Sequence, residues 1–102
     1  MMESRRTREQ PGPDPDGLPG AELIAAGLAD LERGVESVEA LLVSIGAPRL
    51  LRLGLDVQSP LSSPEKRLYE LLRREHPDAA HSRYNALVAR LVSFERGAEC
   101  AS

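Results

Sequence analysis

Aromatic side chains are almost absent from this sequence of 102 residues, which contains two tyrosines, one phenylalanine and no tryptophan. The cores of β-sandwiches and β-barrels normally use aromatic and β-branched side chains, so neither fold is expected. Leucine, alanine, arginine and glutamate are abundant instead, and all four favour helices. A chain of this length also limits the protein to a single domain.

Cysteine and long apolar runs are scarce as well. The single cysteine, Cys100, cannot form an intrachain disulfide, which predicts a reduced, cytoplasmic environment. No apolar run approaches the roughly 20 residues of a membrane-spanning helix, and no signal-peptide pattern opens the chain, so no membrane partner is expected. The net charge of −3 gives no overall attraction to nucleic acid or to anionic lipid.

Motifs for catalysis, nucleotide binding and metal binding are also missing. The chain contains no GxGxxG, no phosphate-binding loop, no GxSxG and no CxxC. His76 and His81 are five residues apart and separated by Pro77, a spacing that does not fix two metal ligands on one helix face. The sequence therefore predicts no metal and no cofactor.

Proline and glycine divide the chain into segments. The stretch 10–20 holds four prolines and three glycines, so residues 1–19 are predicted to form a disordered arm. Residues 20–98 are predicted to form a single helical domain. The last residues, 99–102, are predicted to be a flexible tail.

An apolar stripe is the strongest positive signal. Its members recur at alternating spacings of four and three residues, the pattern of a heptad-repeat helix. They are Ile24, Leu28, Leu31, Val35, Val38, Leu42 and Ile45. The alternative is a break at Gly34, with a second helix that begins at Ser37. Because the register continues across Gly34, one long helix over about 20–45 is predicted.

The remainder of the chain predicts shorter helices. An apolar connector with a short helical turn at 48–53 is expected after the long helix. An antiparallel helical hairpin follows, with helices over about 63–76 and 79–98, because the residue before Pro77 avoids the α conformation. The predicted fold class is all-α, a small helical bundle.

The leading functional hypothesis is a non-catalytic module for protein–protein interaction, either a homodimer or the small subunit of a complex. About 80 ordered residues make a marginal core, so association would bury further apolar surface. Gly20, Gly27 and Gly34 lie seven residues apart beside the stripe, and such a row would let another helix approach closely. The predicted interface comprises Ile24, Gly27, Leu28, Leu31, Gly34, Val35, Val38 and Leu42.

Two alternatives remain open. A small nucleic-acid-binding regulator would use a basic ridge on the helical hairpin. The members of this ridge are Arg67, Arg74, Arg83 and Arg90. An enzyme would use His81, Tyr84 and Glu95, which are polar side chains on the apolar face of the last predicted helix. In that case a histidine oriented by a carboxylate would act as the general base.

Overall fold

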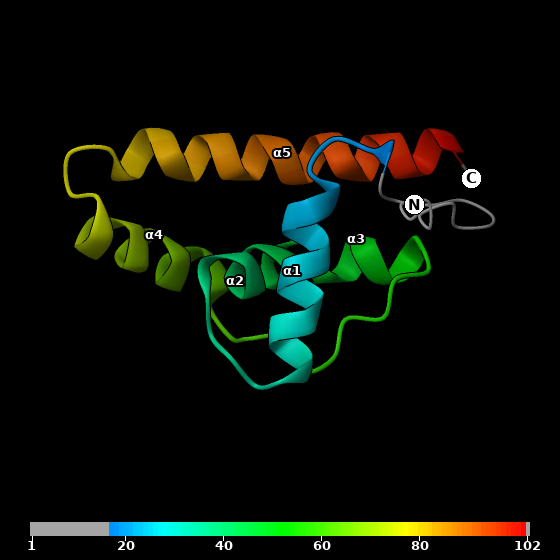
Figure 1. Cartoon of the computed structure of the whole chain (residues 1–102), viewed down its shortest axis with the longest axis horizontal. Coiled ribbons are helices and arrows are strands. Elements are labelled where there is room, and N and C mark those ends of the chain that lie inside the picture. The colour runs from blue at the N-terminus through cyan, green and yellow to red at the C-terminus, as the bar shows by residue number, and fades with distance from the viewer. Residues whose placement is uncertain (1–16, 102) are drawn as a thin grey trace, which may run out of the picture.

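The computed structural model describes residues 17–101, and this part of the chain folds into five helices without a strand (Figure 1). In chain order the helices are α1 (Ala21–Glu32), α2 (Val38–Ile45), α3 (Ala47–Arg52), α4 (Pro64–Glu75) and α5 (Ala80–Ala101). The predicted all-α bundle with a short helix in the connector and a closing hairpin is confirmed. The predicted disordered arm falls mostly on residues 1–16, which lie outside the described residues.

The predicted single helix over 20–45 is wrong, because the chain breaks between α1 and α2. After the end of α1, Gly34 adopts a left-handed conformation with φ 72°. Ser37 then begins α2, since its hydroxyl accepts a hydrogen bond from the Ala40 N–H at 3.0 Å. The same hydroxyl donates to Asp30 Oδ2 at 2.6 Å, and this bond joins the two helices across the turn.

We expect Ser37→Ala to destabilise the protein by about 1–2 kcal/mol, the usual cost of losing an N-cap hydroxyl. The matched control is Ser63→Ala, because Ser63 stands at the N-cap of α4 but makes no side-chain capping bond. Urea unfolding followed by circular dichroism measures both changes. Equal effects of the two substitutions would show that the Ser37 hydroxyl does not stabilise the turn.

Two of the three spaced glycines allow close packing inside the chain. A Cβ atom at Gly27 would collide with the Glu39 carbonyl oxygen and lie 2.8 Å from Val43 Cγ1. A Cβ atom at Gly20 would lie 2.9 Å from the Arg90 carbonyl oxygen. The predicted glycine groove is therefore occupied at Gly27 by α2 of the same chain, which α1 crosses in Figure 1.

The centre of the core is α2, which contacts each of the other four helices. A short helix that is apolar on nearly all sides is expected to be enclosed in this way. The fully buried large side chains are Leu41, Leu42 and Val43 of α2, Leu50 of α3, Leu68 of α4 and Phe94 of α5. The core thus lies between the α1–α2 pair and the α4–α5 hairpin.

The connector after α3 is held in place by Ser44. This buried hydroxyl donates a hydrogen bond to the Ala40 carbonyl oxygen at 2.8 Å and accepts one from the Leu61 N–H at 3.0 Å. Proline stands in the first turn of both α3 and α4, where its missing N–H removes no helical hydrogen bond. The connector therefore returns over α2 before α4 begins.

The last helix is longer than the sequence predicts. α5 continues through residues 99–101, which were expected to be a tail, and Arg49 of α3 forms an ion pair with Glu99 there. The Arg49 Nε and Nη2 atoms lie 3.0 Å and 2.8 Å from Glu99 Oε2. Leu18, near the start of the described chain, approaches Gly97 of the same helix. Residues 97–99 of α5 are therefore in contact with α3 and with the segment that precedes α1.

Candidate functional site

Most of the predicted interface is used inside the chain. Ile24, Gly27, Leu31 and Leu42 are buried, Leu28 and Val38 are half-buried, and Gly34 and Val35 are exposed. The break after α1 turns the first half of the stripe onto α2, and α2 in turn packs on α4 and α5. Because the chain covers most of the stripe itself, the stripe is not an open face for a second copy.

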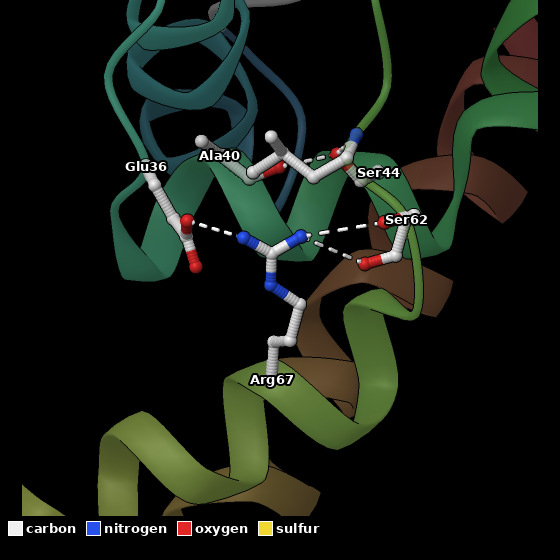
Figure 2. Close-up of polar contacts among 6 residues, drawn as sticks. Glu36, Ala40, Ser44, Ser62 and Arg67 are labelled. Carbon is white, nitrogen blue, oxygen red and sulfur yellow. Dashed lines mark hydrogen bonds and ion pairs between the residues drawn. The ribbon is translucent and has the colours of Figure 1, made fainter.

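Arg67, the first member of the predicted basic ridge, forms polar contacts with two other segments of the same chain. Its guanidinium forms an ion pair with Glu36, which precedes α2 (Figure 2). Its Nη1 donates a hydrogen bond to the Ser62 carbonyl oxygen at 3.1 Å. Arg67 thus links α4 to the α1–α2 turn and to the connector, and part of its charge is already compensated.

The other three arginines do not form a continuous basic surface with it. Arg90 pairs with Glu22 of α1 at 3.1 Å, so the acidic N-terminal helix compensates a second member of the ridge. Arg74 and Arg83 have no carboxylate partner among residues 17–101, and they line two different hollows. This arrangement weakens the nucleic-acid interpretation, since affinity for phosphates depends on uncompensated, clustered positive charge.

The three residues of the enzyme alternative are not brought together. His81 and Glu95 are 14 residues apart on α5, which corresponds to about 21 Å along a helix. His81 is exposed, whereas Tyr84 packs edge-to-face on Tyr69 with 5.8 Å between ring centroids. Burial, and to a lesser extent the charge of Glu65, raises the pKa of the Tyr84 hydroxyl above its ordinary value. Glu95 is therefore too far from His81 to orient it as a general base.

A hollow of about 340 Å³ lies between α2, α4 and α5. It is lined by Val38 and Glu39 of α2, by Leu72, Glu75 and His76 at the end of α4, and by Arg83, Ala86, Leu87 and Arg90 of α5. We refer to it as the α2/α4/α5 hollow. It combines the N-terminal half of α5 with the first turn of α2, two segments that are far apart in the sequence.

The lining of the α2/α4/α5 hollow combines apolar side chains with side chains of both charges. Leu72 is buried and Leu87 packs on the core, so the apolar part continues into the protein interior. Arg83 provides positive charge from α5, whereas Glu39 and Glu75 provide negative charge from α2 and α4. The sequence alone does not reveal this site because its lining comes from three separate helices, although Arg83 and Arg90 stand out as basic residues.

A second depression lies at the C-terminal end of α4. It has a volume of about 470 Å³ and is lined by Glu70, Arg73, Arg74 and Pro77. Three of these four side chains are charged, and none belongs to the apolar core. Because its lining does not reach the apolar core, whereas Leu72 and Leu87 connect the α2/α4/α5 hollow to the core, that hollow is the better candidate site.

Comparisons with protein-family models, curated proteins and solved structures gave no match. Among residues 17–101, no three histidine, cysteine, aspartate or glutamate side chains gather in an arrangement that could hold a metal ion. None of the helices in this part of the chain has a stretch long and apolar enough to cross a membrane. The side chains around the α2/α4/α5 hollow are therefore the basis for inferring a function.

Proposed function

We propose that the protein is a non-catalytic helical module that binds another protein through the α2/α4/α5 hollow. The observation that carries this proposal is an apolar cavity surface, formed by Val38, Leu72 and Leu87, that opens between charged side chains. Its volume of about 340 Å³ is near the lower limit of small-molecule pockets. That size suits an apolar side chain inserted by a partner, the arrangement that provides most of the binding energy in many protein interfaces.

The charges around the hollow define the chemistry of the partner segment. Arg83 of α5 favours an acidic residue in the partner, and Glu39 of α2 and Glu75 of α4 favour a basic one. We therefore expect a segment with a large apolar side chain between residues of opposite charge. Such rim charges contribute chiefly to specificity and to the rate of association.

A different protein is a better partner for this site than a second copy of the chain. The main reason to expect a homodimer is the apolar stripe, and most of that stripe is covered by the protein's own helices. The proposal retains the small-subunit interpretation and places the protein in the cytoplasm, where its single cysteine would remain reduced. A nucleic-acid-binding role receives less support, because Arg67 and Arg90 already pair with glutamates.

Selection from a phage-displayed library of random peptides tests the proposal even though the partner is unidentified. We expect the enriched peptides to share a large apolar residue flanked by an acidic and a basic residue. Ala86→Trp places a bulky ring in the hollow and should reduce binding of these peptides at least about tenfold, a loss of about 1.4 kcal/mol.

The matched control is Ala89→Trp, because Ala89 is exposed on the same helix but does not line the hollow. This variant should bind the selected peptides as the unmodified protein does. If no peptide is enriched, or if both variants bind equally well, the proposed binding site is wrong.

A further inference from the structure

Glu95 is the only charged side chain buried within residues 17–101, with 6% of its surface exposed. It lies on α5 against the corner between α2 and α3. An added Cβ atom at Gly46 would lie 2.8 Å from Glu95 Oε2 and 2.9 Å from Leu91 Cδ1. The carboxyl group thus occupies space that exists because residue 46 has no side chain.

The buried carboxyl group has no hydrogen-bond partner among residues 17–101. Two charged side chains act on it: Arg49 from α3, and Glu99 from the next turn of α5. Arg49 directs its Nε and Nη2 atoms to Glu99. The α2–α3 corner presents Gly46, which has no titratable group. Glu95 therefore has a cation nearby but no direct bond to it, and burial of an unpaired charge is unfavourable.

The surroundings of Glu95 raise the pKa of its carboxyl group. Burial raises the pKa of the Glu95 carboxyl group, Arg49 lowers it, and Glu99 raises it, with burial as the largest effect. Glu95 consequently binds a proton more tightly in the folded chain than in the unfolded chain. This contribution to stability is fully present below the unfolded pKa and is lost as the pH rises through the folded pKa.

We propose that Glu95 is a pH-sensitive contact, which holds the C-terminal half of α5 on the α2–α3 corner when protonated and weakens that attachment when ionised. The groups involved are Glu95, the Arg49–Glu99 pair and the space at Gly46. The α2/α4/α5 hollow uses residues 83–90 at the other end of the same helix. The proposal therefore does not depend on what the hollow binds.

Thermal unfolding of the unmodified protein and of Glu95→Gln, measured between about pH 4 and pH 8, tests the stability effect. We expect the variant to melt several degrees higher at pH 8, and we expect the two melting temperatures to converge toward pH 4. The control Glu22→Gln removes an exposed carboxylate that pairs with Arg90 and does not act on Glu95, and it should not raise the melting temperature at pH 8. A Glu95→Gln variant that is no more stable than the unmodified protein at pH 8 would overturn the proposal.

A carboxyl ¹³C NMR titration measures the pKa of Glu95 directly, and this pKa separates a charge effect from a loss of packing. The signal lost in Glu95→Gln identifies Glu95, and its titration midpoint should lie above that of an ordinary glutamate. The midpoint should rise in Arg49→Gln and fall in Glu99→Gln, because these neighbours act in opposite directions. A midpoint at or below the ordinary value in the unmodified protein would contradict the proposal.

Discussion

Replacing Gly27 with alanine is expected to destabilise the protein by about 2–3 kcal/mol, the scale of overpacking in a well-packed interior. The added methyl group would meet the Glu39 carbonyl oxygen and Val43 Cγ1 where α1 crosses α2. A backbone carbonyl within a helix cannot rotate away, so the two helices would have to separate. Alanine improves helix propensity by only about 1 kcal/mol, which is less than the cost of this collision.

Gly97→Ala is the matched control, because Gly97 is also a glycine inside a helix. Its added methyl group would lie 3.2 Å from Leu18 Cδ2, the end of a side chain that can move. This variant should be as stable as the unmodified protein or more stable, by up to about 1 kcal/mol. Urea unfolding compares the two variants. If Gly27→Ala were also stabilising, the close packing of α1 on α2 at Gly27 would be wrong.

Phe94→Ala is the second substitution with a large expected effect, a loss of about 3–5 kcal/mol. Phe94 is the only phenylalanine in the sequence, is 1% exposed, and belongs to the single core cluster of the described chain. Removing its ring leaves a cavity, because the surrounding structure relaxes only partly around a truncated core side chain. Since domains of this size have a total stability of about 5–15 kcal/mol, the variant should be partly unfolded at 37 °C.

The control is Leu51→Ala, since Leu51 is 50% exposed on α3. Truncation there should change stability by less than about 0.5 kcal/mol. Helical circular dichroism measured at increasing temperature separates the two expectations. Similar melting curves for the two variants would mean that Phe94 is not at the centre of the core.

The helical fold was predictable because its determinants are local. Apolar spacing and Pro77 between α4 and α5 placed three helices close to their observed bounds. The break between α1 and α2 was not predicted. The apolar residues of α1 and of α2 both face the core, and their spacing of four and three residues continues across the break as it would in one helix. The signals for the break were Gly34 and the N-cap residue Ser37, and its Asp30–Ser37 hydrogen bond is a polar contact that apolar spacing does not encode.

The candidate site was less predictable because distances across the fold determine it. The sequence identified Arg83 and Arg90 as basic residues, but it could not show that they line the same hollow as Glu39 of α2. Glu95 was recognised as a polar residue within an apolar stripe, and the structure shows that it is buried. Its separation of about 21 Å from His81 follows once α5 is known to be one continuous helix.

The central claim is that the α2/α4/α5 hollow, rather than another apolar surface, binds the partner protein. The most direct measurement is a two-dimensional ¹H–¹⁵N NMR titration of the labelled protein with a peptide enriched in the selection. We expect the largest shift changes to occur at Val38, Leu72 and Leu87 and to disappear in Ala86→Trp. Changes centred on Val35 or Leu51, the two exposed large apolar side chains among residues 17–101, would contradict the claim.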